Sequence, residues 1–463
     1  MLSPTISFLL VSFSLGELGD GLNIFQGIYL VSLGWNEGAV GTALSLMGFT
    51  ALAVQTIAGD VIDKTNFDRR KFLSIASVAT ALSASMIFFV QPGNTQHGLI
   101  FISKIIEGVS SSFIGPCLGA LTLATFGPHH FDAVMASNAL WGHIGSCVAA
   151  VLAGIVAYFM YPDIKFCFLV IAASALSAVF FVQFLPEGDR LMGRGFQGKQ
   201  ALDEFGHVEQ LQGNDRKFPE EGLGKADSMT EIPQPSTYWE VISDKRCFLL
   251  CLTGFFFHFA NANVLLVLGE LMGGEGEDGG ASQAAIPLIA GAIVLAQITM
   301  AVATWAGDKL THRGVGRKPL FMAGIITLPI RCALIIYWKD ASEAFLLSTQ
   351  ILDGLGGGFF GLIHPFLVAD MSFGTGRFNL MMGLTASTFG LGATLSNFLG
   401  QNIVERYGHV ASLTASLILS FVPIIIFGCF MPETLGDRDH NRTKKSKTIH
   451  SEQEETSYVN MPL

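Results

Sequence analysis

The chain has 463 residues, of which 50% are hydrophobic and only 14% are charged, and its formal net charge is −10. Soluble domains carry about 25% charged residues, so this composition excludes an ordinary soluble protein. The negative charge, without a basic patch interleaved with aromatics, excludes nucleic acid as a partner. No nucleophile–base pair, metal-ligand spacing or phosphate-binding loop is recognisable, so we expect neither an enzyme nor a bound metal or cofactor.

Apolar runs of roughly 20 residues, the length that an α-helix needs to cross a bilayer, follow one another along the chain. Hydrocarbon offers no partner for backbone polar groups, so each run is predicted to be helical. The first run lacks a basic n-region and a cleavage site, so we take it as a span and not as a signal peptide. The sequence predicts twelve spans, over residues 5–33, 38–62, 72–91, 98–124, 132–158, 164–185, 246–271, 284–308, 318–338, 344–369, 378–404 and 410–431.

Lysine and arginine are unevenly divided between the two sets of short loops. Eight follow the second and eighth spans, and three lie in loops of the opposite side: Lys64, Arg69, Arg70, Lys71, Lys309, Arg313, Arg317 and Lys318 against Lys165, Lys339 and Arg406. The positive-inside rule places the first set in the cytoplasm, together with both termini. We expect an integral multi-pass protein, in the plasma membrane rather than in an organelle membrane.

The two halves of the chain repeat at a nearly constant offset. At an offset of 246 residues, Glu107 corresponds to Asp353 and Glu187 corresponds to Glu433. At an offset of 248, the triplet "AGD" of 58–60 recurs at 306–308. An even number of spans in each half makes the halves parallel repeats. The expected organisation is a six-helix bundle over 1–187, a cytoplasmic linker over 188–243, a second bundle over 244–433 and a disordered tail over 434–463.

Polar residues stand three apart in the first, fourth, seventh and tenth predicted spans. Residues at this spacing share one face of a helix, and a charge at the bilayer centre costs roughly 2.5–3.5 kcal/mol, so it usually faces a bundle interior or water. We expect these pairs, with His143 of the fifth span, to line a pathway for substrate and protons. The pairs are Glu17 and Asp20, Lys104 and Glu107, His258 and Asn261, and Gln350 and Asp353.

The acids among these residues outnumber their one fixed base, Lys104. Buried carboxylates that bind and release protons would couple transport to a proton gradient, and the same acids would suit a cationic or amine substrate. A static buried pair is the alternative for Lys104 and Glu107. The scarcity of central arginine argues against phosphate esters. Arg331, in the ninth span, is expected to snorkel to the headgroups.

Glycines and basic residues suggest where the molecule moves. The glycines of the tenth span form small-xxx-small pairs that let a neighbouring helix approach, so a hinge or moving contact is predicted at Gly354, Gly357, Gly358 and Gly361. An acid at the end of a span can bind a base or the N-terminus of a facing helix and so hold a mouth shut. We expect gating from Gly59, Asp63, Lys64, Arg69 and Arg70, and from Gly307, Arg317 and Lys318.

Two parallel six-span halves, a long middle segment and these basic motifs resemble the major facilitator superfamily, whose signature after the second span is G-x-x-x-D-[RK]-x-G-R-[RK]. Asn66 stands where glycine is expected, Arg69 and Arg70 come two residues late, and Thr311 replaces the acid of the second copy. The resemblance covers everything but the middle segment and the tail. It implies an all-α membrane protein of twelve transmembrane helices, arranged as two parallel-repeat six-helix bundles around a central pathway.

The resemblance also implies a function. It points to a secondary active transporter that moves a small solute or ion by alternating access, coupled to protons, in a lipid bilayer and as a monomer. A non-transporting receptor or sensor on a transporter scaffold is the alternative.

Overall fold

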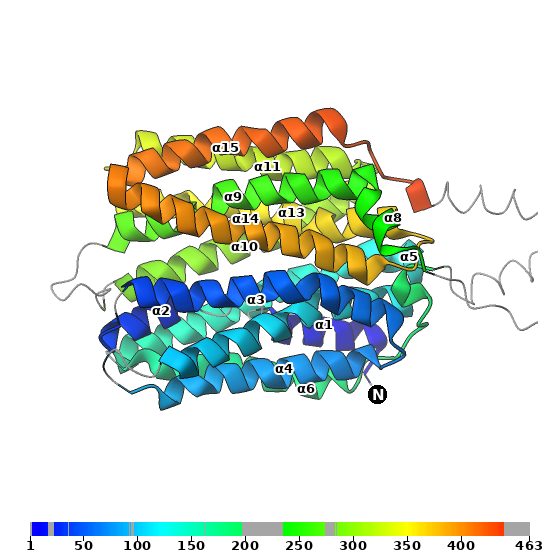
Figure 1. The fold of residues 1–463 in the computed structure, drawn as a ribbon, viewed down its shortest axis with the longest axis horizontal. Helices are drawn as coiled ribbons and strands as arrows, with labels where there is room; N and C mark the ends of the chain where they lie inside the picture. The colour runs from blue at the N-terminus through cyan, green and yellow to red at the C-terminus, as the bar shows by residue number, and fades with distance from the viewer. Residues whose placement is uncertain are drawn as a thin grey trace, which may run out of the picture.

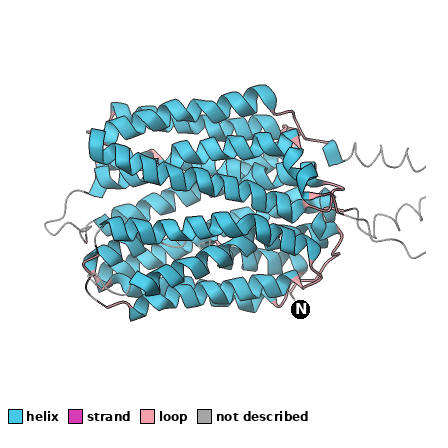
Figure 2. Ribbon diagram, in the orientation of Figure 1, coloured by secondary structure: helices cyan, strands magenta, loops and turns pink. Residues whose placement is uncertain are grey.

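The computed structural model describes residues 2–16, 23–35, 37–91, 93, 97–161, 163–196, 235–273, 283 and 285–438. These residues form α-helices with three short 3-10 segments, at Ile87–Phe89, Ile164–Cys167 and Met192–Arg194, and no β-strand occurs among them (Figure 2). The predicted site residues Glu17 and Asp20 lie outside the described ranges, as do most of the linker and the tail.

The long helices run roughly parallel in two bundles that lie side by side (Figure 1). The first bundle contains α1 (Pro4–Leu15), α2 (Asn23–Ser32), α3 (Glu37–Lys64), α4 (Arg69–Met86), α5 (His97–Met160) and α6 (Phe168–Val182). The short α8 (Tyr238–Ser243) precedes the second bundle, which contains α9 (Lys245–Gly273), α10 (Ala285–His312), α11 (Arg317–Tyr337), α12 (Glu343–Ser348), α13 (Gln350–Ser372), α14 (Phe378–Tyr407) and α15 (His409–Phe430).

The stretch named α5 covers two predicted spans. Its backbone leaves the helical region at Gly127, where φ is 71° and ψ is 171°, a conformation that glycine adopts without strain. Pro128 follows and lacks the N–H that would continue the hydrogen-bond ladder. Ile100 and Ala157, from opposite ends of the stretch, belong to one buried cluster, so the chain doubles back at Gly127.

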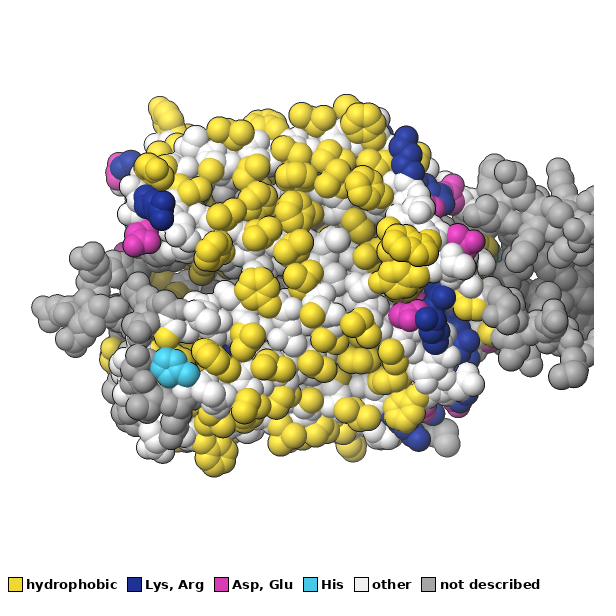
Figure 3. Space-filling model, viewed as in Figure 1, with side chains coloured by type: hydrophobic (Ala, Val, Ile, Leu, Met, Phe, Trp, Pro, Cys, Tyr) yellow, Lys and Arg dark blue, Asp and Glu magenta, His cyan; other side chains and the backbone are white. Residues whose placement is uncertain are grey.

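Nine helical segments of the described chain are long and apolar enough to cross a membrane, and one of them is the doubled α5. Hydrophobic side chains cover the middle of the face shown in Figure 3, and charged side chains gather toward its two ends. The start of α1 and the end of α15 lie at the same end of the molecule (Figure 1). The all-helical fold is confirmed, while the count of twelve spans stays a prediction.

Residues that repeat between the two halves of the sequence make equivalent helix–helix contacts in the two bundles. A Cβ on Gly108 would lie 2.6 Å from the backbone oxygen of Met47, so only glycine lets the first half of α5 approach α3 this closely. A Cβ on Gly354 would lie 2.6 Å from the backbone oxygen of Ala296, where α13 meets α10. The residues that repeat at an offset of 246 therefore make the same contact in both bundles.

Candidate transport pathway and gate

The buried ion pair of the first bundle lies on α5. The Lys104 ammonium is 2.7 Å from Glu107 Oε2, and these side chains are only 1% and 10% exposed. One helical turn separates the two residues, which brings the groups together as the spacing predicts. The pair faces α2, α4 and α6, because Gln26, Thr80 and Phe168 lie around the Glu107 carboxylate.

The second bundle also buries an ion pair in the middle of its helices, between α13 and α11. Asp353 Oδ1 is 2.5 Å from Arg331 Nη1, and the arginine side chain is 1% exposed. The same guanidinium donates to Asn261 at 3.2 Å and to Gln350 at 3.4 Å. Asn261 in turn donates to Asp353 at 3.4 Å. Three of the four predicted polar residues of this bundle therefore meet at one centre.

The prediction that Arg331 snorkels to the headgroups is wrong. Its guanidinium turns inward because one carboxylate and two amide oxygens lie within reach, and these partners offset the cost of burying the charge. Sequence reasoning overlooked the pairing because Arg331 and Asp353 lie on different helices. One signal was present: Asp353 had no base among the polar pairs of its own half.

The histidines take three different environments. His258 stacks on Phe389, with ring centroids 5.4 Å apart, and does not join the hydrogen bonds of Asn261 on the same helix. His143 Nδ1 lies 2.8 Å from Gln297 Oε1, which joins α5 to α10 across the two bundles. His364, which was given no role from the sequence, hydrogen-bonds Thr385 at 2.8 Å.

Polar contacts join the bundles at the end that carries the basic loops, and Asp63 forms one of them. Its carboxylate is 1% exposed and accepts hydrogen bonds from the Leu380 N–H at 2.8 Å and from the Asn379 side chain at 2.7 Å. An acid from α3 thus satisfies free N–H groups in the first turn of α14. A Cβ on Gly59 would lie 2.1 Å from the Asn379 oxygen, so glycine is required there.

The basic residues of the first motif stay within their own half. Lys64 is exposed and pairs with Asp60 at 2.6 Å, and Arg69 donates to the Arg190 oxygen at 3.2 Å. Arg70 pairs with Asp68 at 2.6 Å. Across the interface, Asp60 receives Arg377 of the second half at 2.8 Å. The contacts that cross from this motif therefore come from its acids and its glycine.

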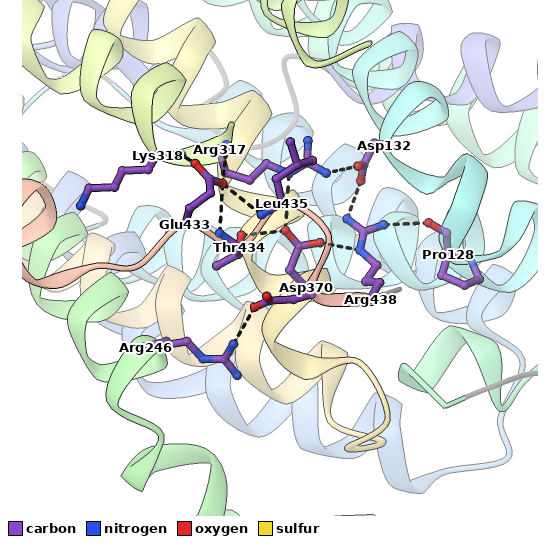
Figure 4. A network of polar contacts seen from close by, with 11 residues as sticks. Pro128, Asp132, Arg246, Arg317, Lys318, Asp370, Glu433, Thr434, Leu435 and Arg438 are labelled. Atoms are coloured by element: carbon purple, nitrogen blue, oxygen red, sulfur yellow. Dashed lines mark hydrogen bonds and ion pairs between the residues drawn. The ribbon is translucent and has the colours of Figure 1, made fainter. Parts of the chain in front are cut away.

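A second polar contact between the bundles surrounds Arg317 (Figure 4). Arg317 binds Asp132 of the first half and, at 3.4 Å, Asp370 of its own half. Arg438, beyond α15, also binds both carboxylates and donates to the Pro128 oxygen at 2.7 Å. Burial disfavours the charge of Arg438, but Asp370 and Asp132 outweigh it and raise the pKa of its guanidinium. Two acids and two bases alternate in this ring.

The other residues of the second motif act inside their own bundle. Glu433 accepts from the backbone N–H groups of Arg317 at 2.8 Å and Lys318 at 3.0 Å, and so caps α11. The Lys318 side chain points away from the ring (Figure 4). A Cβ on Gly307 would lie 2.6 Å from Leu362 of the same bundle, so Gly307 does not reproduce the position of Gly59 between the bundles.

Each bundle also sends the segment after its last helix toward the other bundle. The Gly195 oxygen, beyond α6, accepts from the Gly374 N–H at 2.7 Å, and Arg438, beyond α15, reaches Pro128 and Asp132. Sequence reasoning missed these contacts, because Asp132 stood at the start of the fifth predicted span with no partner assigned to it, and Arg438 lay in the predicted disordered tail. The repeat of Glu187 as Glu433 was the one signal that pointed to these segments.

The glycines of α13 divide into two groups. A Cβ on Gly358 would lie 2.7 Å from the Ala303 Cβ, and one on Gly357 would lie 2.5 Å from the Met300 side chain, so both face α10 closely, as Gly354 does. A Cβ on Gly361 would meet nothing within 4 Å. The close contact therefore includes three of the four predicted glycines, and it lies inside one bundle.

Comparison with known proteins decides the family. The family model described as Major Facilitator Superfamily matches residues 5–315. The chain belongs to the major facilitator superfamily. It is 29% identical over 431 residues to proteins named uncharacterized MFS-type transporter in two strains of Mycobacterium tuberculosis, CDC 1551 / Oshkosh and H37Rv, with 92% of each chain covered.

Two solved structures of transporters are similar to this chain in fold. The proton:xylose symporter XylE is similar with a TM-score of 0.66 and 15% identity, over 93% of this chain and 95% of that one. The nucleoside transporter NupG is similar with a TM-score of 0.59 and 16% identity, over 93% of this chain and 100% of that one. The protein is thus a multi-pass membrane protein of a transporter family, and its relatives are not enzymes.

Proposed function

We propose that this chain is a secondary active transporter that moves a small solute by alternating access. The observation that carries the proposal is the pair of polar contacts between the bundles, at Asp63 and at Asp132. Both join the bundles at the end with the basic loops. Hydrogen bonds and ion pairs of this kind have two discrete states, made or broken, which suits a gate between rigid bodies.

The positive-inside rule assigns the end with the basic loops to the cytoplasm. The structure then corresponds to a state that is closed toward the cytoplasm. Opening requires that Asp63 leaves the first turn of α14 and that Asp132 leaves Arg317 and Arg438. Loss of these partners uncovers charged groups to water, which offsets part of the cost of separation.

Proton coupling is assigned to Glu107, with Lys104 as its partner. Arginine stays charged in proteins, whereas a buried lysine can lose its proton, so Lys104 and Glu107 can exchange a proton more readily than Arg331 and Asp353. Asp20 is the second candidate, because the repeat matches it with Asn261, a hydrogen-bond partner of Asp353. The carboxylates also favour a neutral or cationic solute over an anion.

The test is uptake into proteoliposomes under an imposed pH gradient, screened over sugars, nucleosides, amines and organic acids. The first two classes are included because the similar solved structures are a xylose symporter and a nucleoside transporter. We expect accumulation of one class in the wild type, and exchange without pH-driven accumulation in Glu107→Gln. Full pH-driven accumulation by Glu107→Gln would contradict the coupling role, and no uptake of any class would contradict transport.

A further inference from the structure

A small cavity lies beside Glu107 inside the first bundle. It offers about 20 Å³ to the centre of a water-sized sphere, and Gln26, Thr80, Ser83, Ala84, Ser103 and Glu107 are among the residues that line it. Glu107 Oε2 is occupied by Lys104, whereas Oε1 has no hydrogen-bond partner among the described residues. Gln26 is 6% exposed, and its side chain has no hydrogen-bond partner among the described residues either.

The repeat explains why the cavity exists. Thr80 of α4 hydrogen-bonds Ser110 at 3.0 Å, and in the second bundle Thr327 faces Gly356, where a Cβ would lie 2.6 Å from its hydroxyl. Matching Thr80 with Thr327 places Ala84 opposite Arg331. The second bundle therefore fills this position with a guanidinium that reaches Asp353, and the first bundle leaves it to the methyl group of Ala84.

Charge decides what can occupy the space. Arg331 neutralises Asp353 in the second bundle, and Lys104 neutralises Glu107 in the first. A second cation beside Glu107 would therefore be a buried positive charge with no further carboxylate to neutralise it among the described residues. A neutral water needs at least about 10–15 Å³ by this measure and two to four polar partners. The cavity meets both requirements, because Glu107 Oε1 and the hydroxyls of Ser83 and Ser103 are able to accept hydrogen bonds and the Gln26 amide is able to donate one.

We propose that this cavity holds one buried water that binds the free oxygen of Glu107. The Ser83 and Ser103 hydroxyls lie 2.9 Å from each other, and each donates to the backbone oxygen of the other, so each hydroxyl oxygen can still accept a hydrogen bond from the water. The water donates to Glu107 Oε1 and to a serine hydroxyl, and accepts from Gln26. Its role, which rests on the proposed proton coupling, is to exchange protons with Glu107 from within the bundle.

Radiolytic hydroxyl footprinting of the full chain in lipid nanodiscs detects such a water without a substrate. Phe168 lines the cavity and is 3% exposed, and Phe321 is 0% exposed in an apolar cluster. We expect Phe168 to be oxidised several-fold faster than Phe321. Ala84→Val should remove this excess by filling the space, and Gln26→Leu should remove it by deleting a partner. Val78→Ile, at an exposed position of the same helix, should leave it unchanged.

Two results would overturn the proposal. One is oxidation of Phe168 at the rate of Phe321 in the wild type, or an excess that persists in both Ala84→Val and Gln26→Leu. The other is protection of Phe168 together with thermal stabilisation in sodium but not in potassium, which would make a cation the occupant. Neither measurement uses transport, so a failed footprint leaves the transporter proposal standing, and pH-independent transport contradicts the coupling role without affecting the footprint.

Discussion

The Asp63 carboxylate, at the end of α3, accepts a 2.8 Å hydrogen bond from the backbone N–H of Leu380, in the first turn of α14 of the other bundle. A helix cap thus joins the two halves of the chain through residues that are 317 positions apart in the sequence. Because a cap stabilises a helix whose first N–H groups are otherwise free, α14 is stabilised by the first bundle only while the two are in contact.

Asp63→Ala should shift the protein toward a state that is open at the end that carries the basic loops. Loss of an N-terminal cap costs about 1 kcal/mol, so the ratio of open to closed molecules should rise severalfold, up to about tenfold. The measurement is the rate at which a membrane-impermeant thiol reagent modifies a cysteine placed at Ser372, which is buried at this end. Asp68→Ala is the matched control, since Asp68 caps α4 of its own bundle. Equal rates in Asp63→Ala and Asp68→Ala would contradict the gate.

The cap at Asp68 also gives a pH dependence. Burial acts to raise the pKa of the Asp68 carboxyl, but hydrogen bonds from the Arg70 side chain and backbone outweigh it and lower the pKa. A lowered folded-state pKa contributes stability that is present above the usual value near about 4 and is lost as the pH falls through the folded-state value. The melting temperature of Asp68→Asn should therefore lie below that of the wild type at pH 7, and the two should converge in acid. A gap that is constant with pH would contradict this.

The ring around Asp132 should show coupling between its members. Arg438→Ala leaves Asp132 and Asp370 with Arg317 as their common base, and Asp132→Ala leaves two bases against Asp370. Residues of one ion-pair network couple by about 0.5–3 kcal/mol, so the double variant should lose less stability than the sum of the single losses. Thermal unfolding of the four proteins in detergent measures this. Strict additivity would mean that Arg438 and Asp132 act independently.

Arg331→Ala should destabilise the protein strongly, by about 3–5 kcal/mol, because it leaves the Asp353 carboxylate buried without its base. Arg331→Ala/Asp353→Ala should recover part of the loss, since it removes the unpaired charge. Lys339→Ala is the control, because Lys339 pairs with Asp340 in an exposed position and should cost less than about 1 kcal/mol. If Arg331→Ala were as mild as Lys339→Ala, the arginine would have to reach the headgroups after all.

Gly358→Leu and Gly361→Leu form a matched pair one turn apart. A Cβ on Gly358 would lie 2.7 Å from Ala303, and a Cβ on Gly361 would meet nothing within 4 Å. Overpacking costs about 1–3 kcal/mol, so Gly358→Leu should lower the melting temperature and trap one face of the transport cycle, whereas Gly361→Leu should be tolerated. Melting temperature and uptake report the two effects. Normal uptake in Gly358→Leu would rule out movement at this contact.

The sequence predicts contacts best where they are local or where a pattern repeats. Lys104 and Glu107 meet because a spacing of three residues places them on one helical face. The cap at Asp63 is one of the two kinds of partner predicted for an acid at the end of a span, a base or the N-terminus of a facing helix. The break within α5 lies at Gly127, between the predicted end of the fourth span and the predicted start of the fifth. Local spacing and polarity contain this information directly.

The contacts that sequence reasoning missed join distant segments. Arg331 meets Asp353 only because α11 packs on α13, and spacing along the chain gives no measure of that packing. Arg438 reaches Asp132 because the segment after α15 crosses to the other bundle, while its polar composition is also typical of a disordered tail. Such partners depend on the arrangement of whole helices, which the hydrophobic pattern of one segment does not specify.

The two bundles are proposed to separate and close at the end that carries the basic loops. Measurement of the distance between two spin labels by double electron–electron resonance tests this movement most directly. Spin labels would be placed at exposed Lys71 of the first bundle and exposed Arg313 of the second, after replacement of the seven native cysteines. We predict two distance populations in lipid, with the longer one increased by Asp63→Ala and by Asp132→Ala. A single distance that is identical in the wild type and both variants would contradict the account.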